Sequence, residues 1–358
     1  MYKINSKHLI FFIFSVTAIS ARTYASIFIG VNGRDTWISA LIATFLLLGF
    51  IFLIMFISLK TKTLTLEKVF YNTYPKLLGN IFLFLFCAGL FLTSLEAATV
   101  ESSAIHTTIF IETPVWYCLA FFIIPAAYVA SKNFRTISIV VIVTISIIFV
   151  SNLFLMTLLY QYKNFQYLLP ILFNGLSKEN IFATLMLLGS FSSIAIVFPF
   201  LRYVRDKENL IKNSLLGTFI ICILVTFVFV LLIGTFGPLR ASNIYYPEFY
   251  QAQRLDIEDF LEFGDFFFLL RTVCNLFLKY VLSLTGIITL LRNKIKRKKV
   301  FIAIYTVIIA VLSYFIGSNQ FVMFNLLRPL QFILLVVFFV IPLITYVIYF
   351  FKYKRMKM

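Results

Sequence analysis

The chain is divided into long apolar runs with almost no charge, and this feature excludes most folds open to 358 residues. Each of ten runs is about as long as the ~20 residues that an α-helix needs to cross a bilayer. None alternates apolar and polar residues with a period of two, as membrane-barrel strands do. We therefore expect an all-α integral membrane protein with ten transmembrane helices in one polytopic domain, residues 1–358. The expected spans are Leu9–Gly30, Trp37–Leu59, Leu77–Ser103, Pro114–Ser131, Ile137–Tyr160, Ile181–Leu201, Asn213–Phe236, Phe263–Leu291, Val300–Ile316 and Leu326–Phe351.

The composition agrees with a chain whose solvent is lipid. Hydrophobic residues make up 61% of the chain and charged residues 13%, against about 25% charged in soluble domains. These values exclude a disordered chain, a secreted disulfide scaffold and a cytosolic enzyme. The four cysteines lie in apolar runs without pairing or metal-ligand spacing, so we expect core residues, no metal and no cofactor.

The net charge of +17 is distributed unevenly between the two sides of the expected membrane. In a soluble protein such a charge would suggest a nucleic acid partner. Here 22 Lys and Arg fall on one side and 6 on the other, which is typical of cytoplasmic loops. We therefore predict that both termini are cytoplasmic and that nucleic acid is not a partner. The basic segments are residues 3–7, 60–76, 132–135, 202–212, 292–299 and 352–357.

The first span contains a polar stretch, Ser15–Ser26, that includes Arg22. An ionisable group at bilayer depth costs about 3 kcal/mol, so it is a candidate functional residue. A helix interrupted here would present free backbone groups to a ligand. Ser and Thr can also bond to their own helix or allow close helix packing. No Gly or Pro forces a break, and both interpretations stay open.

Ionisable residues also occur in the third and eighth spans. Lys279 lies roughly 24 Å from the outer end of its span, too deep to snorkel, so it should face the bundle and could pair with Glu96. Arg271 is close enough to the outer end to snorkel outward. Glu101 is not on the same helix face as Glu96 and is expected to mark the outer boundary of its span.

The sixth span carries a cluster of small polar residues, Gly189, Ser190, Ser192 and Ser193, before Pro199. This pattern fits a break point or a kinked packing helix. Because polar interruptions recur five spans apart, we predict a 5+5 inverted repeat with helices 1 and 6 interrupted around a midplane site. The predicted ligand-binding residues are Thr17, Ser20, Ala21, Arg22, Thr23, Glu96, Gly189, Ser190, Ser192 and Lys279.

The longest outer loop, residues 237–262, combines acidic residues with the aromatic stretch Asn243–Tyr250. It fits a solvated loop with an interfacial aromatic belt. It also fits an outer gate or a partner contact. The acidic residues are Glu248, Asp256, Glu258, Asp259 and Glu262.

Several short motifs, in their order and spacing, resemble the spore germination permease family, the B subunits of bacterial nutrient germinant receptors. They are Asp35–Ser39, Glu112–Trp116, Phe236–Pro238, Tyr246–Pro247, Asp259–Glu262 with Asp265, and Lys279. The resemblance implies the leucine-transporter fold of amino acid–polyamine–organocation transporters, a ligand such as an amino acid, A-type and C-type partner subunits, and the spore inner membrane. Two positions depart from the family pattern: Arg22 lies in a region that is usually small and neutral, and Arg271 replaces an apolar residue. If Arg22 faces the pocket, it suits a carboxylate.

Three functions are compatible with these features. The first is a receptor subunit that binds a small nutrient and signals through partners. The second is a working amino acid or solute permease with the same fold. The third, a membrane enzyme, is disfavoured because no Walker A, HExxH or dinucleotide-binding motif is present.

Overall fold

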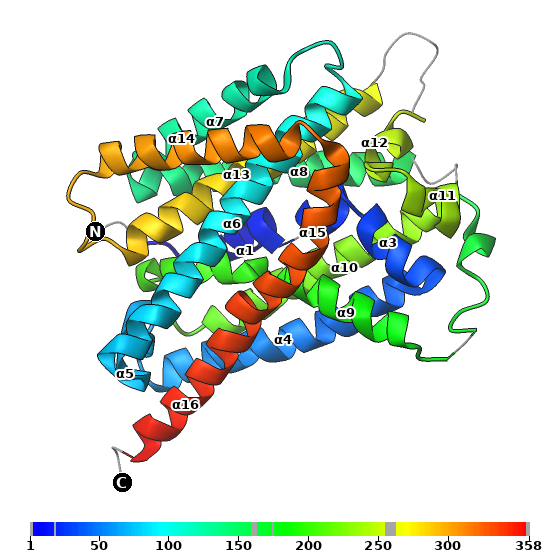
Figure 1. Cartoon of the computed structure of the whole chain (residues 1–358). Coiled ribbons are helices and arrows are strands. Elements are labelled where there is room, and N and C mark those ends of the chain that lie inside the picture. The colour runs from blue at the N-terminus through cyan, green and yellow to red at the C-terminus, as the bar shows by residue number, and fades with distance from the viewer. Residues whose placement is uncertain (1–2, 18, 159–162, 174, 255–262, 356–358) are drawn as a thin grey trace.

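The computed structural model describes residues 3–17, 19–158, 163–173, 175–254 and 263–355, which form a bundle of helices (Figure 1). The described residues contain no strand, only an isolated bridge between Ile4 and Val204. Helices satisfy their own backbone hydrogen bonds, which a lipid environment requires. The helices are α1 (Ser6–Thr17), α2 (Ile19–Thr23), α3 (Ser26–Asn32), α4 (Thr36–Lys60), α5 (Leu66–Thr73), α6 (Lys76–Thr108), α7 (Val115–Ser131), α8 (Phe134–Leu158), α9 (Lys178–Phe191), α10 (Leu210–Phe236), α11 (Pro238–Asn243), α12 (Pro247–Ala252), α13 (Phe263–Leu290), α14 (Lys298–Gly317), α15 (Gln320–Leu334) and α16 (Ile341–Arg355), with 3-10 helices η1 (Gly33–Asp35), η3 (Phe165–Leu168) and η4 (Ser192–Tyr203) and the π-helix η5 (Leu335–Val340).

Eight helical stretches among the described residues are long and apolar enough to cross a membrane. They confirm an all-helical membrane protein, while the count of ten stays a prediction. Two features account for the difference. The helix of the expected fourth span, α7, has 17 residues and is shorter than the eight spanning stretches. The expected first span is divided among the short helices α1, α2 and α3.

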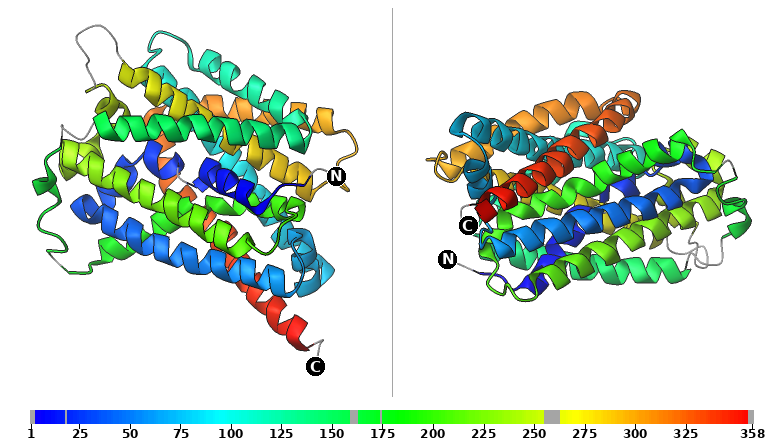
Figure 2. Two further views of the ribbon diagram at one scale, coloured as in Figure 1. Left: turned by 180° about the vertical axis from the view of Figure 1, so that it is seen from behind. Right: turned by 90° about the horizontal axis from the view of Figure 1, so that it is seen from below.

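The interrupted segment lies in the centre of the bundle (Figure 2). α1 packs against α10, η4, α8 and α13, while α2 contacts α9, α10 and α13. α6 packs against α13, α7 and α14. By contrast, α7 and α14 expose large apolar side chains such as Phe121, Ile124 and Phe315. A surface of this kind is stable against lipid tails, so the central polar residues are shielded by a lipid-facing shell.

The first span is interrupted between α2 and α3, at Tyr24 and Ala25. The backbone tightens there: Ile27 N donates to Tyr24 O at 3.2 Å and Phe28 N to Ala25 O at 3.1 Å. The Thr23 hydroxyl donates to Ile19 O at 2.9 Å. A hydroxyl that donates to a carbonyl of the preceding turn in this way favours a bend in the helix. The predicted interruption of helix 1 is confirmed, and it needs neither Gly nor Pro.

The sixth span changes from α9 to the 3-10 helix η4 at Ser192. Its hydroxyl donates to Gly189 O at 2.6 Å and to Leu334 O at 3.2 Å. Gly189 lies so close to α15 that a Cβ would overlap the carbonyl group of Gln331. Pro199 lies inside η4 and removes one backbone donor. Helix 6 is therefore interrupted, as predicted.

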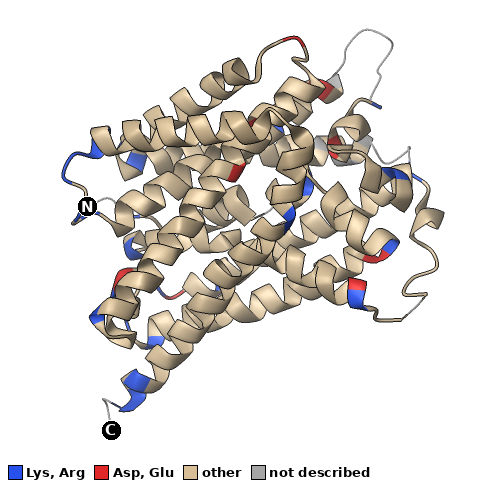
Figure 3. Ribbon diagram, in the orientation of Figure 1, with Lys and Arg blue, Asp and Glu red and all other residues tan. Residues whose placement is uncertain are grey.

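Lys and Arg gather at one end of the bundle, where α5, the α13–α14 connection and the end of α16 lie (Figure 3). The start of α1 lies at the same end in all views. The basic segment 60–76, which the charge pattern assigns to a cytoplasmic loop, contains the short helix α5, which packs against α6 and α16.

Candidate functional site

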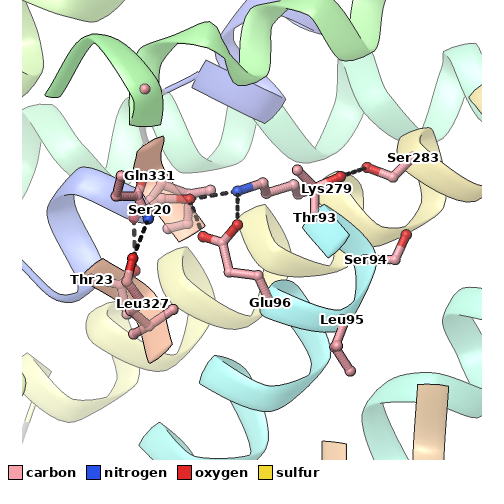
Figure 4. Close-up of polar contacts among 12 residues, drawn as sticks. Ser20, Thr23, Thr93, Ser94, Leu95, Glu96, Lys279, Ser283, Leu327 and Gln331 are labelled. Carbon is pink, nitrogen blue, oxygen red and sulfur yellow. Dashed lines mark hydrogen bonds and ion pairs between the residues drawn. The ribbon is translucent and has the colours of Figure 1, made fainter. Parts of the chain in front are cut away.

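A closed polar cluster occupies the bundle interior beside the interruption of the first span (Figure 4). Lys279 Nζ on α13 lies 2.8 Å from Glu96 Oε2 on α6, and both side chains have 0% of their surface exposed. Lys279 also donates to the hydroxyl of Ser20 on α2 at 2.5 Å. The predicted Lys279–Glu96 pair is therefore present, and it links three helices.

Two further side chains complete this cluster. Ser20 and the Tyr24 hydroxyl each donate to Glu96 Oε1 at 2.6 Å. Gln331 Nε2 on α15 donates to the Tyr24 hydroxyl at 3.1 Å. Both carboxylate oxygens of Glu96 thus accept hydrogen bonds, which offsets the cost of burying the two charges. We call Ser20, Tyr24, Glu96, Lys279 and Gln331 the central cluster.

A second cluster lies on the other side of α2 and carries an excess of positive charge. Arg22 Nη2 lies 2.7 Å from Glu248 Oε1 on α12, and Arg271 Nη2 on α13 lies 2.8 Å from Glu248 Oε2. Arg22 Nη2 also donates to Asn152 Oδ1 on α8 at 3.0 Å. All three charged side chains are buried. We call Arg22, Asn152, Glu248 and Arg271 the arginine cluster; its formal net charge is +1.

The electrostatics of the arginine cluster favour an ionised Glu248. Burial raises the pKa of this carboxyl, but the neighbouring Arg22 and Arg271 outweigh burial and hold its pKa below the usual value. Arg271 Nε has no hydrogen-bond partner among the described residues. The cluster borders a cavity of about 30 Å³, which has room for about two water molecules.

Two expectations are corrected by the arginine cluster. Arg271 does not snorkel outward; it is 4% exposed because Glu248 offers a buried counter-charge. Glu248 does not lie in a solvated loop, because α12 folds into the bundle against α13 and α2. Four acidic residues of the same loop lie outside the described residues: Asp256, Glu258, Asp259 and Glu262.

The predicted ligand-binding residues divide into three groups. Ser20, Glu96 and Lys279 belong to the central cluster, and Arg22 to the arginine cluster. Thr17 and Thr23 donate to carbonyls of their own helices, and Ala21 is buried on α2. Gly189 and Ser192 serve the α9–α15 contact, whereas the Ser190 hydroxyl is buried without a hydrogen-bond partner in the described part of the chain. Their binding of a ligand remains a prediction.

Glu101 is not a boundary marker. It is 4% exposed within α6, and its Oε2 has no hydrogen-bond partner among the residues that the structure describes. The expectation followed from its position near the outer end of the third span, but α6 continues to Thr108. The helix therefore keeps Glu101 inside the bundle.

Four site residues were missed by sequence reasoning: Tyr24, Asn152, Glu248 and Gln331. Gln331 is a polar side chain within the last apolar run, a signal that was available. Tyr24 lies in the polar stretch of the first span. Glu248 lies in the aromatic stretch Asn243–Tyr250. Because Arg22 and Arg271 lie within expected spans and each needs an acidic partner, Glu248 was a candidate for that partner.

No group of three or more His, Cys, Asp or Glu residues that could hold a metal ion occurs among the described residues. The arrangement instead offers hydroxyl, carboxylate, ammonium and guanidinium groups. Such groups bind small polar molecules by hydrogen bonds and charge pairing.

Comparison with known proteins gives a sequence match and a structural match. A family model described as spore germination protein matches residues 3–322. No curated protein sequence matches the chain. The crystal structure of a mutant manganese transporter from Eremococcus coleocola is similar, with a TM-score of 0.54 and 14% identity over 95% of this chain and 77% of the transporter. At this identity the likeness shows the fold alone, that of leucine-transporter-like permeases.

Proposed function

The chain belongs to the spore germination protein family, a family of permease-like membrane proteins, and on that premise we propose that it is the B subunit of a nutrient germinant receptor. It binds a small nutrient in the middle of the membrane and signals germination through A-type and C-type partner subunits. It performs no catalytic step. The observation that carries this proposal is the pair of buried charged clusters on either side of the interrupted first span, at Ser20 and Arg22.

The ligand is a molecule with a carboxylate, an amino acid being the simplest case. The central cluster is formally neutral, since Lys279 and Glu96 compensate each other. The arginine cluster is not, because two guanidinium groups share one carboxylate. A ligand carboxylate can compete with Glu248 for these two guanidinium groups, and the planar guanidinium of Arg22 can bind it in a bidentate manner.

The cavity of about 30 Å³ is too small for an amino acid, so binding requires a rearrangement. In our mechanism the ligand carboxylate takes the place of Glu248 on Arg22 and Arg271. Glu248 then leaves with α12, a helix of only six residues. The ligand thus favours the arrangement in which α12 is displaced, and the population shifts as far as its differential affinity allows.

The alternative is a working permease for an amino acid or a related solute. The permease-like fold supports it. In that case the displaced state would lead to release on the cytoplasmic side. Uptake of labelled amino acids into proteoliposomes separates the two: a receptor binds without accumulation, whereas a permease accumulates the solute.

The experiment that tests the receptor function replaces Arg22 by Ala in spores. The germination response to nutrients should be abolished, while the protein remains in the membrane. Arg240→Ala is the matched control, since Arg240 is also an outer-side arginine but stacks at 5.8 Å from the Phe236 ring centroid. An unchanged response in the Arg22 variant contradicts the proposal.

Partners and orientation are tested separately. We expect the chain to co-purify with A-type and C-type subunits from spore inner membranes. Both termini should lie on the cytoplasmic side, because the basic segments gather at that end. A tag at either terminus that reacts with an impermeant reagent outside intact protoplasts contradicts this orientation.

A further inference from the structure

A second cavity, far larger than the one at the arginine cluster, lies at the basic end of the bundle. It measures about 630 Å³ and is bounded by the α7–α8 connection, the end of α13 and the start of α14. Four of its lining residues are cationic: Lys132, Arg135, Arg292 and Lys298. None of the described residues that line it is acidic. The lining side chains therefore give the cavity a positive formal charge.

The walls of this cavity are ordered by specific contacts. Lys298 Nζ donates to Ser131 O and Lys132 O, both at 3.0 Å, and so ties α14 to the end of α7. The Lys132 ammonium lies 3.9 Å from the Tyr128 ring centroid. Lys132 and Lys298 are thus anchored at the rim, and less of their side-chain entropy is lost when an anion binds.

Two independent features point to an anion inside the cavity. Thr285 lines it, is 6% exposed, and its hydroxyl has no hydrogen-bond partner in the described ranges. The long helices α8 and α14 begin at Phe134 and Lys298, two lining residues. Helix N-termini direct unpaired backbone N–H groups and a positive dipole end at bound anions.

We propose that this cavity binds the phosphate group of an anionic phospholipid from the adjacent leaflet. The helices beside it expose large apolar residues to the membrane, including Tyr128 on α7, Ile139 on α8 and Ile304 on α14. Acyl chains can lie against these faces while the headgroup occupies the basic cavity. Basic pockets between helices on the cytoplasmic side suit such headgroups. The inference is independent of the nutrient site, because it concerns the opposite end of α13.

Binding is tested on the full-length protein in detergent by native mass spectrometry, with titration of short-chain phosphatidylglycerol at 150 mM salt. The double variant Arg135→Gln/Arg292→Gln removes two lining cations. Since each basic residue near a membrane surface is worth about fivefold in affinity, the first bound lipid should be weakened about 25-fold. The matched control is Lys296→Gln/Arg297→Gln, which removes the same charge from exposed residues that do not line the cavity. It should change the affinity less than threefold.

Three further measurements distinguish a lipid headgroup from free phosphate as the occupant of the cavity. Thr285→Val should weaken phosphatidylglycerol binding while leaving the melting temperature of the lipid-free protein nearly unchanged. Phosphatidylcholine of the same chain length should bind much more weakly. Equal losses in the cavity and control variants overturn the proposal, as does complete competition by millimolar inorganic phosphate, which identifies a free-phosphate site instead.

Discussion

Replacing Lys279 by Met tests whether the buried ion pair holds the central cluster together. Lys279 Nζ lies 2.8 Å from Glu96 Oε2, and neither side chain is exposed. Without Lys279, the Glu96 carboxylate keeps only the hydroxyl donors of Ser20 and Tyr24. Breaking a buried pair on one side costs about 3–5 kcal/mol, so the unfolding equilibrium constant should rise more than 100-fold.

The double variant Glu96→Gln/Lys279→Met should recover most of that loss. A Gln at position 96 keeps an oxygen that can accept from Ser20 and Tyr24, and no uncompensated charge remains. We expect a net cost below about 2 kcal/mol and a coupling energy of at least about 3 kcal/mol. Unfolding by titration with sodium dodecyl sulfate, followed by circular dichroism, measures all four members of the cycle.

The partly exposed ion pair of Arg202 and Glu67 provides the matched control. Its atoms lie 3.5 Å apart and its side chains are 25% and 20% exposed. The same cycle there should give a coupling energy below about 1 kcal/mol. Additive effects of the Glu96 and Lys279 substitutions would refute the argument, because they would mean that the two charges do not interact across α6 and α13.

Four other predictions concern the two clusters and the helix packing. Glu248→Gln removes the internal competitor for Arg22 and Arg271, so germination should need at least about fivefold less ligand; a higher requirement in dose–response curves argues against displacement of Glu248. The pKa of Glu248 is lower in the folded protein than in the unfolded chain, where it is about 4.3, so Glu248 stabilises the fold above that pH and loses this effect as pH falls through its folded-state pKa. The difference in unfolding free energy between wild type and Glu248→Gln should therefore shrink in acid. A difference that does not depend on pH contradicts the pairing. Ligand binding should be equal in sodium and choline buffers, because the Lys279 ammonium already supplies a cation beside Ser20 and Glu96; sodium-dependent binding opposes this. Gly189→Ala should destabilise the protein by about 1–3 kcal/mol, since the added Cβ meets the Gln331 carbonyl, and an unchanged midpoint of unfolding would show that α15 can move away.

The sequence predicts the helical membrane fold well because apolar length is a local property. The helices begin and end within a few residues of the expected spans, as α13 (Phe263–Leu290) shows against an expected Phe263–Leu291. The interruptions of the first and sixth spans were also predictable, from hydroxylated and small residues. Depth along a span was enough to suggest the partner of Lys279, since few acids lie inside other spans.

The arginine cluster was not predictable in the same way. Glu248 lies in a segment that reads as an outer loop, and its burial depends on how α12 folds back against α13 and α2. That contact joins Glu248 to Arg22, 226 positions away in sequence. Gln331 stands out as a polar residue in the last apolar run, but its partner Tyr24 lies 307 positions away, and only the folded structure brings the two side chains together.

The central claim is that the interrupted first span forms a binding site for a small carboxylate-bearing nutrient. Equilibrium binding of labelled amino acids to the purified receptor complex tests it most directly. The account predicts saturable binding of at least one amino acid, weakened about tenfold or more by Arg22→Ala, which removes a charge-assisted hydrogen-bond donor, and unchanged by Arg240→Ala, whose guanidinium lies 5.8 Å from the Phe236 ring centroid. Absence of saturable binding for every amino acid, or equal effects of the two arginine substitutions, would contradict it.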